Sequence, residues 1–123
     1  MASFDLETLL TRNLHEVFGE NDAARRRAAI EDIFHEDAVF YEPAGVHRGW
    51  DEIDSVAGIV KAMHPEYRYT PIRPVEQLHD RAGRIQWVSG APDAPPEYAG
   101  TDVIVARDGR IETIYLFFDA LPA

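Results

Sequence analysis

The 123-residue sequence contains no cysteine, which excludes disulfides, thiolate nucleophiles, cysteine-bound zinc and iron–sulfur clusters. It has no apolar run near the roughly 20 residues that a membrane-spanning helix needs, and no signal-peptide pattern at its start. Basic residues are scarce: 12 Lys and Arg stand against 22 Asp and Glu, for a formal net charge of −10. Because phosphate backbones and anionic membranes attract clustered basic residues, neither nucleic acid nor membrane is expected as a partner. We expect a cytoplasmic protein.

What remains is the composition of a globular protein, with 46% hydrophobic and 28% charged residues. The length suits one domain and allows one hydrophobic core. The chain shows neither an internal repeat nor a linker-like stretch. We therefore expect a single domain that spans residues 1–123.

The hydrophobic pattern divides the chain into a helical part and a strand part. Apolar residues at helical spacing predict one helix over 6–18 and a second after a cap at Asn21 or Asp22. They predict a third helix that Gly49 opens and Pro65 stops. Alternation and turn residues predict strands over 38–42, 67–78, 84–90, 98–106 and 110–118. Strands joined by tight turns must be antiparallel. The order α-α-β-α-β-β-β-β thus predicts the α+β class, with a curved, cone-shaped, antiparallel-rich sheet wrapped around three helices.

Asp102 is an acidic residue in the middle of an apolar strand. Alternation places it on the same strand face as Ile104. Folding the hairpin about 108–109 brings it near Leu116 and Phe118. A carboxyl group among such neighbours loses hydration, which raises its pKa and keeps it available as a hydrogen-bond donor. The alternative is that Asp102 faces water or caps a loop.

Glu42 is the second acidic candidate. It ends an apolar strand and precedes Pro43, where a rigid scaffold meets an open side. Such a position suits a catalytic base. The alternative is an ordinary surface acid at the end of a strand.

Several segments resemble one known family. The helix-to-strand passage over 34–45 and 47–53 reads FHEDAVFYEPAG and HRGWDEI, and the last hairpin carries GTDV at 100–103, DGRI at 108–111 and FFD at 117–119. These segments look like those of SnoaL-like polyketide cyclases and ketosteroid isomerases, within the nuclear-transport-factor-two-like superfamily. The resemblance extends over nearly the whole chain in the order of its elements, and it implies the cone-shaped fold.

The resemblance also implies roles for single residues. Glu42 matches the carboxylate that shuttles a proton in ketosteroid isomerases, Asp102 matches the protonated acid of their oxyanion hole, and Phe118 matches a pocket aromatic residue. Those isomerases carry an oxyanion-hole tyrosine on the first helix, which this chain lacks. His15 is the only polar aromatic-type side chain in that neighbourhood. Members of the family often pair through the sheet, so the resemblance implies a homodimer.

The candidate site therefore has two catalytic acids, Glu42 and Asp102, and a predicted set of ligand-binding residues: His15, Trp50, Trp87, Ile114, Leu116 and Phe118. The histidines show no metal-binding spacing, so we expect neither a metal nor a cofactor. The sequence predicts an enzyme of the isomerase, cyclase, dehydratase or epoxide-hydrolase type that acts on a small apolar or aromatic ligand by general acid–base chemistry. The alternative is a non-catalytic ligand-binding or protein-interaction module on the same fold.

Overall fold

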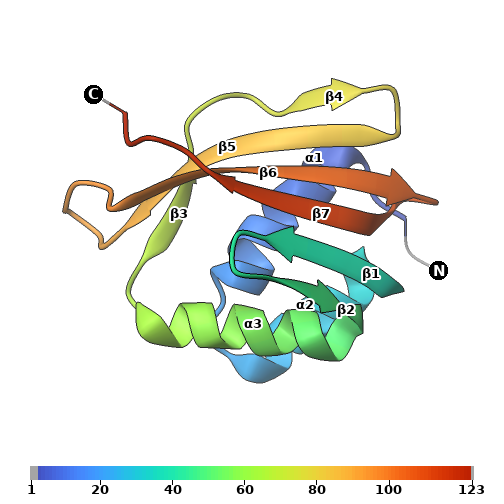
Figure 1. The fold of residues 1–123 in the computed structure, drawn as a ribbon, viewed down its shortest axis with the longest axis horizontal. Coiled ribbons are helices and arrows are strands. Elements are labelled where there is room, and N and C mark those ends of the chain that lie inside the picture. The colour runs from blue at the N-terminus through green and yellow to red at the C-terminus, as the bar shows by residue number, and fades with distance from the viewer. Residues whose placement is uncertain (1–2, 123) are drawn as a thin grey trace.

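The computed structural model describes residues 3–122, and Figure 1 shows their arrangement as helices gathered under a curved sheet. The helical elements are α1 (Leu6–Arg12), the π-helical segment η1 (Asn13–Phe18), α2 (Ala23–Ile33) and α3 (Gly49–Met63). The strands are β1 (Phe34–Glu42), β2 (Gly45–Arg48), β3 (Arg68–Pro71), β4 (Glu76–Leu78), β5 (Ala82–Gly90), β6 (Tyr98–Arg107) and β7 (Arg110–Phe118). This arrangement confirms the predicted α+β class.

The first two helices begin at carboxylate caps. The Asp5 side chain accepts a hydrogen bond of 2.8 Å from the Thr8 backbone N–H, and the Asp22 side chain accepts one of 2.9 Å from Arg25. Each cap satisfies a backbone N–H that the helix itself leaves unpaired. The helix predicted over 6–18 is present, but it changes from α-helical to π-helical geometry at Asn13.

The sheet has the strand order β2-β1-β7-β6-β5-β3, and β4 also pairs with β5. β1 runs parallel to β7, while the other pairings are antiparallel, so the sheet is mixed. Two details differ from the sequence prediction. The strand expected over 67–78 is divided into β3 and β4, because Pro71 and Pro74 offer no N–H to a strand ladder. The turn after Pro43 leads into the additional strand β2.

A tight hairpin sets the register between β6 and β7. Asp108 and Gly109 both have positive φ, 55° and 72°, as a two-residue hairpin turn of this kind requires. The turn pairs Arg107 with Arg110, and a register shift between Val105 and Ala106 then pairs Asp102 with Leu116 and Gly100 with Phe118. The concave face therefore carries Asp102 beside the apolar neighbours that the alternation predicted.

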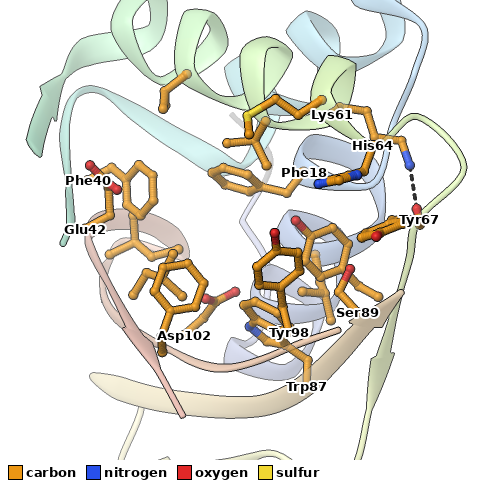
Figure 2. Close-up of a pocket in the computed structure, with 18 residues that line it drawn as sticks. Phe18, Phe40, Glu42, Lys61, His64, Tyr67, Trp87, Ser89, Tyr98 and Asp102 are labelled. Carbon is orange, nitrogen blue, oxygen red and sulfur yellow. Dashed lines mark hydrogen bonds between the residues drawn. The ribbon is translucent and has the colours of Figure 1, made fainter. Parts of the chain in front are cut away.

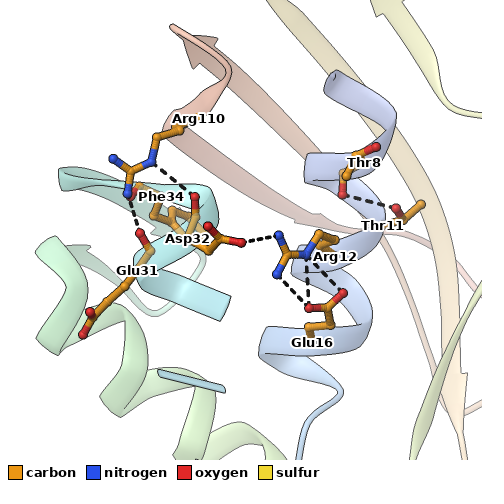
Figure 3. Close-up of polar contacts among 8 residues, drawn as sticks. All are labelled: Thr8, Thr11, Arg12, Glu16, Glu31, Asp32, Phe34 and Arg110. Carbon is orange, nitrogen blue, oxygen red and sulfur yellow. Dashed lines mark hydrogen bonds and ion pairs between the residues drawn. The ribbon is translucent and has the colours of Figure 1, made fainter. Parts of the chain in front are cut away.

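Arginine contacts hold the helical layer against the sheet (Figure 3). The Arg110 guanidinium on β7 donates to the backbone carbonyls of Phe34 at 2.8 Å and Asp32 at 3.3 Å, and also to that of Glu31. Arg12 on α1 pairs with the Asp32 carboxylate at 2.7 Å. These bonds fix the junction of α2 and β1 against β7, and so they position the strand that ends at Glu42.

Among residues 3–122, the helices are all too short or too polar to cross a bilayer.

Candidate functional site

A pocket of about 220 Å³ lies between the concave face of the sheet and the helices (Figure 2). Its walls come from η1, the C-terminal half of α3, and strands β1, β3, β5, β6 and β7. Most of the lining side chains are apolar or aromatic. Val60, Met63, Tyr98 and Phe118 are the well-exposed members of the lining, at 36%, 66%, 43% and 55%, so they mark the mouth.

Asp102 lies on the floor of this pocket, in the middle of β6. The residue is only 6% exposed, and its cross-strand neighbours are Leu116 on β7 and Ile85 on β5. Burial raises the pKa of Asp102 to about 7, and a hydrogen-bonding interaction with the Trp87 indole opposes part of that rise. A carboxyl group with this pKa is substantially protonated near neutral pH. It can therefore donate a hydrogen bond to a ligand oxygen.

Glu42 lines the same pocket from the end of β1, and its side chain is 15% exposed. The hairpin of β1 and β2 pairs Phe40 with His47, which brings the His47 Nε2 atom to 3.3 Å from the Glu42 Oε1 atom. His47 was not among the residues predicted for the site. The sequence pattern that could have identified His47 is a turn at 43–44 between two short alternating segments. This pattern predicts a hairpin, and the hairpin places His47 diagonally opposite Glu42.

The structure brings most of the predicted site residues together. Those that line the pocket are Glu42, Trp87, Asp102, Ile114, Leu116 and Phe118. His15 is exposed and lies outside the lining, because Leu14 and Phe18, one helical turn apart, face the pocket instead. Trp50 also lies outside. It lies in the first turn of α3, whereas the pocket contacts the other end of that helix, and its indole donates to the Phe34 carbonyl at 3.0 Å.

Polar residues at the α3 side of the pocket were not singled out as ligand contacts from the sequence. Lys61 is buried, which lowers its pKa, and its Nζ atom donates to the Tyr67 carbonyl at 2.6 Å. The His64 ring stacks on the Tyr67 ring, with centroids 4.1 Å apart. In the sequence, residues 56, 60 and 63–64 have helical spacing. This spacing was the available indication that one face of α3 leads to these polar residues at the pocket.

The arrangement supports proton transfer in an apolar setting. It combines a buried acid on the floor, which is partly protonated near neutral pH, with a second carboxyl group, held by a histidine, at the β1 side. Hydrogen bonds and charge act more strongly in such a site than in water. Both carboxyl groups belong to the lining of one pocket.

The sequence profile of the SnoaL-like domain matches residues 11–114. The chain therefore belongs to the SnoaL-like family. No curated protein matches the chain.

Solved structures show the same fold. A proposed isomerase of the SnoaL-like family from Agrobacterium tumefaciens superposes with a TM-score of 0.85, at 24% identity over 93% of this chain and 97% of the other. A proposed SnoaL-like polyketide cyclase from Jannaschia sp. CCS1 gives a TM-score of 0.74, at 9% identity over 97% and 90%. A protein of unknown function with a cystatin-like fold from Methylobium petroleophilum gives 0.71, at 18% identity over 99% and 82%.

Proposed function

We propose that this chain is a cofactor-independent enzyme that moves a proton on a small, largely apolar ligand bound in the pocket. One observation carries the proposal: Asp102 is buried in an apolar pocket with a pKa of about 7, and Glu42 lines the same pocket. Two acids held in different surroundings are a common basis for dividing the roles of donor and base. The reaction is of the isomerase, cyclase, dehydratase or epoxide-hydrolase type.

For a ketone ligand the proposed step balances as follows. The Glu42 carboxylate removes a proton from the carbon beside the carbonyl, and the electron pair of the broken C–H bond forms a C=C bond. The carbonyl π electrons move onto oxygen, which accepts a hydrogen bond from neutral Asp102. Glu42 then returns its proton to the same or another carbon. The step needs no oxidant, reductant or metal.

The test is hydrogen–deuterium exchange on 2-indanone, a flat ketone with acidic protons, followed by NMR in D2O. The wild-type protein is expected to accelerate exchange above the buffer rate. Glu42→Gln keeps the size of the side chain but accepts no proton, so it should lose about 10²–10⁴-fold of that acceleration. Its affinity for 2-indanone should stay nearly unchanged. Glu36→Gln, at an exposed position of β1, is the matched control.

Two outcomes contradict catalysis. In one, the wild-type protein binds 2-indanone without accelerating exchange. In the other, Glu42→Gln and Glu36→Gln accelerate exchange equally. Ligand binding without acceleration favours the alternative of a binding module, in which changes in pocket size alter affinity but Glu42 has no special importance.

We also propose that the protein is a homodimer that pairs through the convex face of the sheet. That face carries Tyr41 stacked on Tyr115, with ring centroids 5.1 Å apart, and the 57% exposed Phe117. Exposed aromatic side chains on one face are typical of interaction surfaces. Light scattering at micromolar concentration should give twice the mass of the chain, and Phe117→Asp should reduce it to that of one chain. A wild-type mass of one chain would contradict the proposal.

The cytoplasmic location stays a prediction.

A further inference from the structure

The two tryptophans of the chain differ in what their indole N–H groups contact. The Trp50 indole donates to the Phe34 carbonyl at 3.0 Å. Trp87 is only 4% exposed, and its Nε1 atom has no hydrogen-bond partner among the described residues. A buried donor without a partner costs about 1–3 kcal/mol, and native proteins contain few of them. The Trp87 N–H therefore needs an explanation.

The Trp87 indole is held in place from two sides. Trp87 pairs with Gly100 on β6, and a Cβ atom at Gly100 would lie 2.5 Å from the indole Cζ2 atom. Only glycine leaves room for the ring at that point. On the other side the Tyr69 ring meets the indole edge-to-face, with centroids 4.9 Å apart. The direction of the N–H group is thus set by the fold before any ligand arrives.

The fixed indole lies beside Asp102 on the floor of the pocket. The register pairs Ile85 with Asp102 and Trp87 with Gly100, so Trp87 and Asp102 are diagonal neighbours on the concave face. Figure 2 shows the nitrogen edge of Trp87 turned toward the Asp102 carboxyl group. A hydrogen-bonding interaction of the Trp87 indole with the carboxyl group lowers the Asp102 pKa, so the two groups are close, although the Trp87 N–H forms no hydrogen bond of full geometry. Both side chains line the cavity, so two donors meet at one place on its wall.

We propose that the Trp87 indole N–H and the Asp102 carboxyl group donate to one and the same oxygen atom of the ligand, and that this atom is the oxygen of a carbonyl group. This inference rests on the function proposed above for the same pocket. A carbonyl oxygen accepts two hydrogen bonds, and two donors stabilise it further as it gains negative charge. A hydrocarbon ligand would leave the indole unpartnered. Trp87 on β5 thereby takes the role for which the first helix offers no tyrosine.

The test compares two ligands of the same shape, 2-indanone and 2-methyleneindane, which differ only in the accepting oxygen. In ¹⁵N-labelled wild-type protein, 2-indanone should move the Trp87 indole proton signal downfield, and 2-methyleneindane should not. The Trp50 signal is the internal control, because that N–H already has its partner outside the pocket. A static Trp87 signal with 2-indanone overturns the proposal, and this measurement needs no variant.

Affinities provide the second measurement. Trp87→Phe keeps an aromatic ring but removes the donor, so it should weaken 2-indanone binding about 10-fold, the equivalent of one hydrogen bond. Binding of 2-methyleneindane should change little. An equal loss for both ligands means that Trp87 only fills space, and it overturns the proposal.

The two proposals fail in different ways. Binding of 2-indanone needs no proton transfer, so Glu42→Gln should keep the downfield shift of the Trp87 signal. A moving signal without accelerated exchange contradicts catalysis alone. Accelerated exchange with a static Trp87 signal contradicts the second donor alone.

Discussion

The concave face of the sheet is a packed core in one half and a pocket in the other, although the same strands build both. The closed half lies around Gly83 and Ile104, which pair across β5 and β6. Ile104 is fully buried there, and a Cβ atom at Gly83 would lie 3.2 Å from the Leu10 Cδ1 atom. Helix α1 therefore rests directly on the sheet, and nothing but apolar side chains fits between them.

The open half begins two residues away on β6, at Asp102, and four residues away on β5, at Trp87. Here the covering elements are η1 and the last turns of α3, and they leave a cavity above the strands. Strand alternation decides which side chains face inward in both halves. The distance of the covering helix then decides whether an inward side chain becomes core or lines a ligand site. An acid is tolerated at 102 because its carboxyl group meets a cavity there instead of a packed helix.

The largest expected effect is a pH dependence of stability that belongs to the open half. Folding raises the Asp102 pKa from 3.8 to about 7. Between these values the folded state holds a proton that the unfolded state has lost, so the free energy of unfolding should fall as pH rises. The dependence vanishes below about pH 4 and above about pH 7, and the full difference is roughly 4 kcal/mol.

Urea unfolding at a series of pH values tests this expectation. Asp102→Asn cannot ionise, so it should remove the slope between these two pH values and leave the rest of the curve in place. Asp37→Asn, at an exposed position on β1, is the control and should keep the slope. Parallel curves for the wild-type protein and Asp102→Asn would show that the carboxyl group is hydrated, and the contrast between the two halves would lose its main support.

The second effect compares truncations in the two halves. Ile104→Ala removes a fully buried side chain under α1 and should cost about 3 kcal/mol of unfolding free energy, because the packed half cannot collapse onto the space. Leu116→Ala borders a cavity that already exists and should cost about 1 kcal/mol. It should weaken ligand binding instead. Equal losses in urea unfolding would mean that the pocket is packed as tightly as the core.

The sequence was sufficient for the parts of this contrast that depend on local chemistry. The Asp-Gly turn at 108–109 predicted the hairpin of β6 and β7, but the pairing of Asp102 with Leu116 also depends on a register shift between Val105 and Ala106 that alternation does not encode. The hairpin and the alternation together predicted that Asp102 is inward-facing and desolvated. Recognition of the family and of the α+β class is confirmed on the same segments.

The sequence was insufficient for features that depend on distant parts of the chain. The parallel pairing of β1 with β7 joins segments that are far apart in sequence, and no local pattern encodes it. The direction of His15 depends on a helical register that one residue can change. The unpartnered Trp87 N–H follows from the space left by Gly100 and the ring of Tyr69, which are separated from it along the chain.

The smallest expected effect concerns a second unpartnered polar group, outside the pocket. Asn13 is fully buried where α1 passes into η1, and neither polar atom of its amide has a hydrogen-bond partner among the described residues. Unlike Trp87, Asn13 is not among the residues that line the pocket, so a ligand there would not satisfy its hydrogen bonds. Asn13→Leu has nearly the same shape, removes the polar atoms and favours helix. It should raise the unfolding free energy by about 1 kcal/mol in urea, with 2-indanone binding unchanged. A loss of stability would show that the Asn13 amide is satisfied by a buried water, and the comparison with Trp87 would then no longer hold.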